Sequence, residues 1–167
     1  MIARVLSRLA LAVLSAGAVR AGAQTVPSKK NAPAPGKVVP LDGRQLFGVT
    51  CAACHQANGE GIVDRYPPLA GSEWVSGDPD RMLRIVLRGL TGDVDVQGEM
   101  FRGEMPAWGP QLRDAEVATV VSYVRDKFGA GAPPVTAAMV ARVRKATASR
   151  KKPFTARELR AKAVARD

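Results

Sequence analysis

Residues 50–59, TCAACHQANG, contain both cysteines and the only histidine of the 167-residue chain. Cys51 and Cys54 are separated by two residues, and His55 follows directly. Thiolate sulfur and imidazole nitrogen are ligands for metals such as zinc and iron, and paired thiols also exchange disulfides. The side chains best suited to metal or redox chemistry are therefore gathered in one short segment.

Three chemistries use a segment of this kind. A structural zinc ion needs four ligands, usually from two separated Cys/His pairs, and the chain has no second pair. A thioredoxin-like dithiol normally follows a strand in a βαβ pattern, which the residues before Cys51 do not show. Cys-x-x-Cys-His is also the signature of covalent haem attachment. In that interpretation Cys51 and Cys54 form thioethers with the haem edge and His55 binds the iron.

A haem iron held by His55 needs a sixth ligand, and methionine sulfur is the usual choice in electron-transfer cytochromes. Met105 begins the segment MPAWG, a loop stiffened by proline, and is the preferred candidate. Met100, in a segment of alternating polarity, is the second. Met82 falls on the apolar side of a predicted helix, which favours a core role, and Met139 lies in the basic C-terminal region.

Two further residues are predicted to support the haem. A ligating imidazole normally donates its other N–H to a carbonyl. Pro68 forces Pro67 into an extended conformation, so the Pro67 carbonyl is expected to accept from His55; the alternative is a plain surface turn. Trp108 is expected to form an apolar wall against the haem, or else to pack elsewhere in the core.

The N-terminal residues predict export. Residues 1–23 combine early arginines, an apolar stretch and the small-residue site Ala21-Gly22-Ala23, which are the three parts of a secretory signal peptide. The alternative, a membrane anchor, needs an apolar stretch of about 20 residues. We therefore expect cleavage after Ala23, a periplasmic location and no transmembrane segment in the mature chain. Residues 24–40, rich in Pro, Ala and Lys, are predicted to be a flexible linker.

The formal net charge of +10 is unevenly distributed. Residues 41–128 contain 9 Lys/Arg and 13 Asp/Glu, a net of −4, whereas residues 129–167 contain 10 and 2, a net of +8. Because the acidic part is the predicted folded part, the high pI does not indicate a nucleic-acid partner. The basic C-terminal extension, residues 130–167, is expected either to contact an acidic redox partner or a lipid surface, or to be a disordered, solubilising tail.

Capping and periodicity predict mainly helices. Apolar spacing predicts a helix that ends near Phe128, and the segment 92–103 alternates around Gln97-Gly98 as in a small β-hairpin. Further helix starts are marked by caps or capping boxes. These starts are Asp42 with Gln45, Asp78 with Pro79, Thr136, and Thr155 with Glu158.

The segments GRQLFGVTCAACHQANGEG, YPPLAG, GEMPAWG and EVATVVSYVR, in this order within residues 42–128, resemble a class I c-type cytochrome of the bacterial exported monohaem type. The resemblance implies an all-α cytochrome c fold over residues 41–129, with three to four helices and long loops around one covalently bound haem c. It supports Met105 as iron ligand and Pro67 as partner of His55. It also implies that the first helix crosses the last through Gly43, Phe47, Val120 and Tyr123.

The resemblance implies an electron carrier rather than an enzyme. Its expected partners are a donor dehydrogenase and an acceptor oxidase or reductase. The alternative is a haem enzyme or gas sensor with an open sixth coordination site. One position departs from the family pattern, because Arg113 stands where a Ser or Thr cap commonly begins the last helix. We expect Asp114 to cap that helix, or the helix to begin one residue late.

Overall fold

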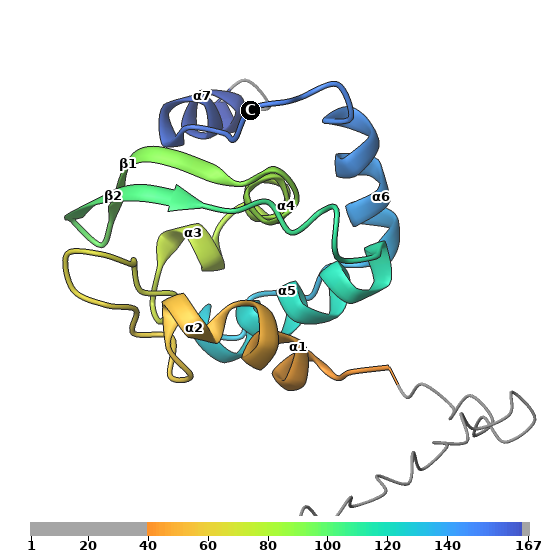
Figure 1. Ribbon diagram of the computed structural model, residues 1–167, viewed down its shortest axis with the longest axis horizontal. Coiled ribbons are helices and arrows are strands. Elements are labelled where there is room, and N and C mark those ends of the chain that lie inside the picture. Colours follow the sequence, from red (N-terminus) through yellow and green to blue (C-terminus); the bar gives the residue numbers. More distant parts are fainter. Residues whose placement is uncertain (1–39, 165–167) are drawn as a thin grey trace, which may run out of the picture. The chain divides into compact units, whose positions relative to one another are not determined.

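The computed structural model describes residues 40–164, so the predicted signal peptide and nearly all of the predicted linker lie outside the described residues. Within this range the chain forms seven helices and one two-stranded sheet (Figure 1). No helix in the described range has the length and apolar character needed to cross a membrane. The elements are α1 Gly43–Thr50, α2 Ala52–His55, α3 Glu73–Ser76, α4 Pro79–Arg88, β1 Leu90–Val96, β2 Glu99–Met105, α5 Asp114–Phe128, α6 Ala137–Ala146 and α7 Ala156–Val164.

Helix α1 begins with the predicted capping box. The Gln45 backbone N–H donates to Asp42 Oδ1 at 2.8 Å, and the Asp42 N–H donates to Gln45 Oε1 at 3.0 Å. The helix ends at Thr50, and Cys51 has a φ of −118° that separates it from α2. The helix that starts at Asp42 is therefore followed by a second short helix, which carries Cys54 and His55.

Helices α1 and α5 cross at very close range, as the resemblance implied. A Cβ atom on Gly43 would lie 2.6 Å from Tyr123 Cβ and 3.0 Å from the Thr119 carbonyl oxygen, so only glycine permits this approach. The ring centroids of Phe47 and Tyr123 are 5.7 Å apart. Val120 is buried in the same contact region of the core. The crossing predicted for these four residues is confirmed.

The start of α5 corrects one expectation. Arg113, not Asp114, occupies the N-cap position. The Glu116 carboxylate accepts from the Arg113 backbone N–H at 2.8 Å and from its guanidinium at 2.7 Å. Asp114 is the first helical residue, and its carboxylate accepts from Arg144 Nε at 2.6 Å. Asp114 therefore does not cap the helix and the helix does not begin late, so both alternatives predicted for this position are wrong.

The predicted hairpin is confirmed and is longer than expected. Strands β1 and β2 pair antiparallel from Leu90 opposite Met105 to Val96 opposite Glu99. Gln97 and Gly98 have φ values of 56° and 82°, the pair of positive values that a tight two-residue hairpin turn requires. Met105, which was expected in a loop, is therefore the last residue of β2.

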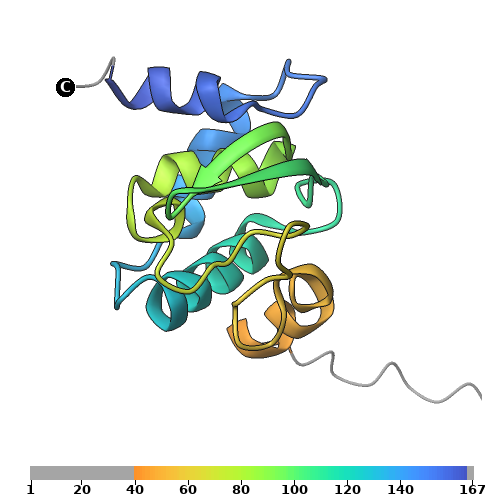
Figure 2. The ribbon, with the colours of Figure 1, turned by 90° about the vertical axis from the view of Figure 1, so that its left-hand side faces the viewer.

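Two apolar clusters fill the interior. The helical core joins α1, α4, α5 and α6, and the hairpin core joins the hairpin to α3, α4 and the C-terminal segment. Figures 1 and 2 show α7 over the hairpin and α4, with α5, α1 and α2 on the opposite side. The fully or nearly buried members of the hairpin core are Trp74, Ile85, Val94, Val96, Phe101, Phe154, Ala156 and Leu159.

The C-terminal extension folds onto the rest of the chain. Thr136 caps α6 by accepting from the Met139 N–H at 3.3 Å. Thr155 and Glu158 form the predicted reciprocal box at α7, with bonds of 2.8 and 3.3 Å. The side chains of Val140, Val143, Phe154 and Leu159 are buried. The described part of the extension thus packs through α6, Phe154 and α7, and the disordered-tail alternative is wrong for these segments.

Several arginines of the extension make internal contacts. Arg142 forms two bonds of 2.7 and 2.8 Å with the buried Asp80 carboxylate, and Arg144 pairs with Asp114. Arg150 pairs with Glu158 at 2.9 Å. Much of the positive charge expected on a free tail is therefore used within the fold. The exposed cations of the described extension with no such printed contact are Lys145, Lys151, Lys152 and Arg157.

Candidate functional site

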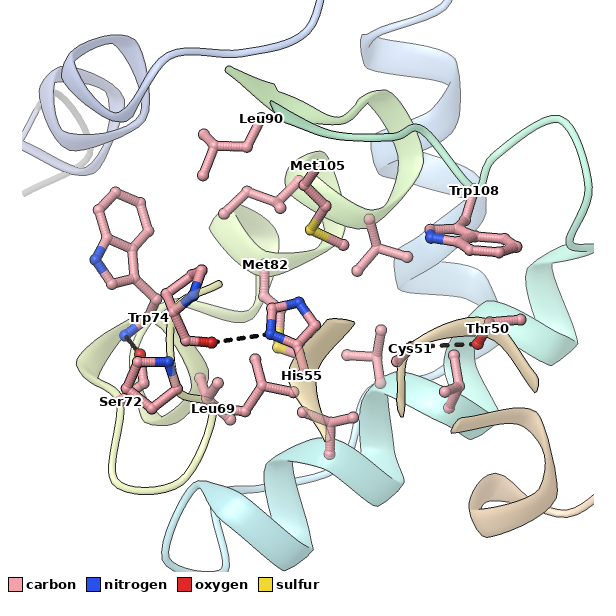
Figure 3. Close-up of a pocket in the computed structure, with 18 of the residues that line it drawn as sticks. Thr50, Cys51, His55, Leu69, Ser72, Trp74, Met82, Leu90, Met105 and Trp108 are labelled. Carbon is pink, nitrogen blue, oxygen red and sulfur yellow. Dashed lines mark hydrogen bonds between the residues drawn. The ribbon is translucent and has the colours of Figure 1, made fainter. Parts of the chain in front are cut away.

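An apolar cavity separates the hairpin and α4 from α5 and the segment around Cys51. It contains about 800 Å³ of space free of protein atoms, a figure that includes its open mouth. Figure 3 shows side chains from both sides converging on it. Its lining comprises Thr50, Cys51, His55, Pro67, Pro68, Leu69, Ser72, Trp74, Val75, Met82, Ile85, Val86, Leu90, Val94, Val96, Met105, Trp108, Leu112, Val120, Val121 and Val124.

A second cavity adjoins the first one. It contains about 580 Å³ of space free of protein atoms, again including its mouth. The two cavities share five lining residues, namely His55, Pro67, Leu90, Val94 and Met105. The second one adds Cys54, which the first does not reach. The space around His55 and Met105 is therefore lined by both cysteines.

The two cysteines are free thiols at partly buried positions. Cys51 lies between α1 and α2 and lines the first cavity, while Cys54 lies in α2 and lines the second. Burial raises the pKa of the Cys51 thiol, and the Thr50 hydroxyl 3.2 Å from its sulfur opposes this rise. The local fold therefore places one cysteine at each of the two adjoining cavities.

His55 is held by the residue that the sequence predicted. Its Nδ1 lies 2.9 Å from the Pro67 carbonyl oxygen. Since a carbonyl can only accept, the proton is on Nδ1 and the second nitrogen is left as a ligand atom. Burial lowers the pKa of His55, and the Pro67 bond opposes this. The lowered pKa leaves the imidazole neutral and the Pro67 bond orients it, with the second nitrogen on the Met105 side of the ring in Figure 3.

Close backbone packing positions the Pro67 carbonyl. The Gly61 N–H donates to the His55 carbonyl at 3.0 Å, and the Ile62 N–H donates to the Tyr66 carbonyl at 2.9 Å. A Cβ atom on Gly61 would lie 2.2 Å from the Tyr66 oxygen and 2.8 Å from the Pro67 oxygen. Gly61 also has a φ of +70°, so glycine is required here for two reasons.

The four candidate methionines differ in whether they line the cavities. Met105 lines both cavities, and Figure 3 shows its sulfur across the space from His55. Met100 is 62% exposed and lines neither of these cavities. Met82 is 8% exposed in the helical core and also lines the first cavity. Met139 lies in α6 and packs against the helical core. Sequence reasoning ranked Met100 second, whereas Met82 is the other methionine that reaches the cavity.

Both tryptophans line the first cavity. The Trp108 backbone N–H donates to the Val86 carbonyl at 2.9 Å, which ties the loop after Met105 to α4. Sequence reasoning assigned no role to Trp74, whose indole N–H donates to the Asp95 carbonyl at 2.8 Å. The signal for Trp74 was weak, because the one-turn helix α3 is too short to show an apolar period.

These residues fit a haem group. Two thiols, one neutral imidazole and one thioether sulfur border a common apolar space, and these are the donors that c-type haem attachment uses. The walls are built mainly of Val, Leu, Ile, Pro and Trp side chains, which suit a large planar apolar ring.

Comparison with known proteins gives a consistent family. The cytochrome c family model matches residues 41–127. Cytochrome c-552 of Thermus thermophilus is 35% identical over 112 residues, which cover 62% of this chain and 84% of the relative. The gluconate 2-dehydrogenase cytochrome c subunit of Pantoea cypripedii is 39% identical over 106 residues, covering 62% of this chain and 24% of that subunit. The fructose dehydrogenase cytochrome subunit of Gluconobacter japonicus is 33% identical over 110 residues, covering 62% and 22%.

The family match spans more than half of the chain and includes every cavity-lining residue from Thr50 to Val124. The match to cytochrome c-552 covers most of that relative's length. The chain therefore belongs to the cytochrome c family, with covalently bound haem c and a role in electron transfer.

Proposed function

We propose that this chain is a periplasmic monohaem cytochrome that carries single electrons from a dehydrogenase-type donor to a respiratory oxidase or reductase. The observation that supports this most is the convergence of His55 and Met105 on one apolar cavity, with His55 Nδ1 held 2.9 Å from the Pro67 oxygen. A carrier needs two strong axial ligands and no substrate site, and this arrangement offers one ligand from each side.

Each site residue has a specific part in the proposal. Cys51 and Cys54 hold the haem by thioether bonds, His55 and Met105 bind the iron, and Trp108 forms part of the apolar wall. The bound haem supplies a one-electron couple between Fe(III) and Fe(II). Because His55 and Met105 would both bind the iron, the chain itself would leave no position on the metal for an external substrate.

The surrounding residues tune the site. The Pro67 carbonyl keeps the proton on His55 Nδ1 and fixes the ring orientation. Val120, Val121 and Val124 of α5 border the cavity and keep water away from it. A neutral thioether in an apolar site favours the less charged, reduced state, so Met105 raises the reduction potential.

Location and partners follow from other parts of the chain. The signal-peptide pattern in residues 1–23 supports export. Relatives that are named as cytochrome subunits of dehydrogenases support a dehydrogenase donor. The exposed Lys145, Lys151, Lys152 and Arg157 form a basic set suited to an acidic redox partner or an anionic lipid surface. We expect no nucleic-acid partner.

Intact-mass and peptide mass spectrometry of the exported protein test the proposal. The expected mass corresponds to a chain that begins at Gln24 and carries one haem, and the peptide that contains Cys51 and Cys54 carries the added mass. Free thiols at both cysteines after maturation in a host that makes c-type cytochromes would contradict the proposed attachment.

Carbon monoxide tests the alternative of an open sixth site. With Met105 bound, the reduced protein at neutral pH should show no spectral change on brief exposure to the gas. Met105→Ala should bind it at once, because its sixth position is vacant. Rapid binding by the unchanged protein would favour a gas sensor or haem enzyme.

A further inference from the structure

Phe154 lies beside β1, in the place that a third strand of the sheet would occupy. Its N–H donates to the Gly89 carbonyl at 3.0 Å, and its carbonyl accepts from the Thr91 N–H at 2.8 Å. These two bonds make a parallel bridge between Phe154 and Leu90. The C-terminal extension is therefore joined to the hairpin by backbone hydrogen bonds as well as by side-chain packing.

Leu90 connects this bridge to the candidate iron ligand. On its other side Leu90 pairs with Met105 in the register of the hairpin. Phe154, Leu90 and Met105 are thus neighbours across three adjacent backbone segments. Leu90 and Met105 also line both cavities, so a shift of Leu90 would move the sulfur-bearing residue relative to His55.

Side chains of the extension also pack directly against the hairpin. Phe154 is 1% exposed and belongs to the hairpin core with Leu159, and Leu90 and Met105 pack against that cluster. The Arg150 guanidinium lies 3.8 Å from the Phe154 ring centroid and donates to the Pro153 carbonyl and the Glu158 carboxylate. Figure 2 shows the hairpin between α7 and the elements on the cavity side. The extension therefore packs against the hairpin, whose last residue is Met105.

Apart from side-chain packing on α3 and α4, the hairpin has little backbone support from other described elements at this position. In the described range the sheet has only two strands, and an isolated two-stranded hairpin is marginally stable in water. Gly89 approaches the Met105 carbonyl so closely that a Cβ atom there would lie 2.6 Å from it. The segment that Phe154 binds is thus in direct contact with the Met105 backbone.

We propose that the extension acts as a strap that holds Met105 over the haem cavity, and that Phe154 is the positioning residue for the iron–sulfur bond. This inference rests on the proposed role of Met105 as axial ligand. It differs from a general stabilising role, because it requires loss of Phe154 to release the sulfur before the whole chain unfolds.

The test compares Phe154→Ala with Val140→Ala in the holoprotein. Both residues belong to the extension and are at most 1% exposed, but Val140 lies in the helical core and not in the cluster that Met105 contacts. Three readings are taken on each oxidised protein: the weak far-red methionine-to-iron band, the apparent affinity for added imidazole, and global unfolding in denaturant. Met105→Ala serves as the fully open reference.

The strap predicts a specific change in Phe154→Ala. Its far-red band weakens, and its apparent imidazole affinity rises about tenfold or more, because the state without bound sulfur becomes more populated. Val140→Ala should unfold more easily but keep the band, with an imidazole affinity within about twofold of the unchanged protein. If Phe154→Ala does not yield holoprotein, Phe154→Leu should show the same changes at smaller amplitude.

The outcomes distinguish failure of the strap from failure of the assignment of Met105 as iron ligand. Equal imidazole affinities in Phe154→Ala and Val140→Ala would overturn the strap, as would an unchanged far-red band in both Phe154 variants. If Met105→Ala keeps the band, the axial assignment itself is wrong. If Met105→Ala loses the band while the Phe154 variants keep it, only the strap fails.

Discussion

One side of the cavity carries His55 and the other carries Met105, and we call them the His55 wall and the Met105 wall. They are held by contacts that differ in sequence separation. His55 receives its partner from Pro67, and short backbone bonds within residues 55–72 fix the intervening loop. Met105 stands at the end of a hairpin that pairs with Phe154, far along the sequence. One wall is therefore closed by local structure, and the other depends on the C-terminal extension.

This difference has a consequence for stability. Local contacts close short loops at low entropy cost, whereas the contact between Phe154 and Leu90 needs the extension to return across the fold. The extension contributes few long-range backbone bonds to the hairpin, so local opening there requires less disruption. We expect the Met105 wall to open first under mild denaturation and the His55 wall to persist.

The strongest way to break the His55 wall is Gly61→Ala. The new Cβ would lie 2.2 Å from the Tyr66 oxygen at a φ of +70°, so clash and backbone strain should together cost about 3 kcal/mol or more. The displaced Pro67 carbonyl should also reduce haem incorporation. Denaturant unfolding and the haem-to-protein ratio measure both effects.

Gly131→Ala is the matched control for Gly61→Ala. Gly131 also has a positive φ, +71°, but a Cβ there would meet no atom within 4 Å, and Gly131 lines neither of the two cavities. Its cost should therefore be strain alone, about 1 kcal/mol, with normal haem incorporation. Equal losses in the two variants would show that the packing around the Pro67 carbonyl has no special role.

A smaller effect is expected from Arg144→Met. Arg144 joins the extension to the loop after Met105, donating to the Gly109 carbonyl at 2.6 Å and the Leu112 carbonyl at 2.8 Å, and it pairs with Asp114. The partly exposed site screens the charge pair, so we expect a loss of about 1–2 kcal/mol, mainly from unpaired carbonyls. Denaturant unfolding measures it.

Arg113→Met provides the comparison for Arg144→Met. Its ion pair with Glu116 has an arginine side chain that is 79% exposed, so solvent screens the charge interaction and the variant should lose less stability than Arg144→Met. The far-red band should weaken in Arg144→Met only, since Arg113 does not connect the extension to the Met105 loop. A larger loss in Arg113→Met would contradict the assignment of Arg144.

The sequence predicted the local elements well, for a physical reason. Capping at Asp42 and Thr155 and the turn at Gln97-Gly98 depend on residues at most three positions apart, so their signals are visible in short segments. His55 and Pro67 are 12 positions apart, and they were predicted as partners from the usual pairing of a ligating imidazole with a carbonyl and from the family resemblance.

Long-range partners could not be predicted in this way. No local pattern indicates that Phe154 pairs with Leu90, or that Arg142 neutralises the buried Asp80. The basic extension was therefore predicted either to contact a partner or to be a disordered tail, and its internal arginine contacts and buried side chains were not foreseen. Met82 was predicted in the core correctly, but helical periodicity cannot distinguish a core surface from a cavity wall.

Acid should loosen the Met105 wall selectively. The Thr155 backbone N–H and then Arg150 lower the pKa of Glu158 to about 2 from 4.5. A depressed folded-state pKa means that its stabilising contribution is complete above about pH 4.5 and is lost as the pH falls towards 2. The stability difference between the unchanged protein and Glu158→Gln should therefore shrink over this range.

Glu116→Gln is the control for the acid experiment. The pKa of Glu116 is also lowered to about 2, chiefly by Arg113, but this residue lies at the start of α5. Its variant should lose stability with the same pH dependence while the far-red band stays intact in the folded protein. A pH-independent difference for Glu158→Gln would contradict the predicted role of this carboxylate.

Replacing exposed lysines of the extension by glutamate should have the smallest effect on the structure. It tests whether the outer surface of the extension docks a partner. Removing the whole extension would expose the hairpin core, so Lys145→Glu, Lys151→Glu and Lys152→Glu are combined instead. The salt dependence of electron transfer to host membranes should become weaker, with folding nearly unchanged. Arg44→Glu with Lys127→Glu is the control, and equal effects from both sets would exclude a specific docking surface.

The most direct test of the two-walled site is the far-red absorption band of the oxidised protein in methionine variants. Met105 and Met82 both reach the cavity, so each is replaced by alanine, with the exposed Met100→Ala as control. The account predicts that only Met105→Ala abolishes the band. Retention of the band in Met105→Ala, or its loss in folded Met82→Ala, would contradict it.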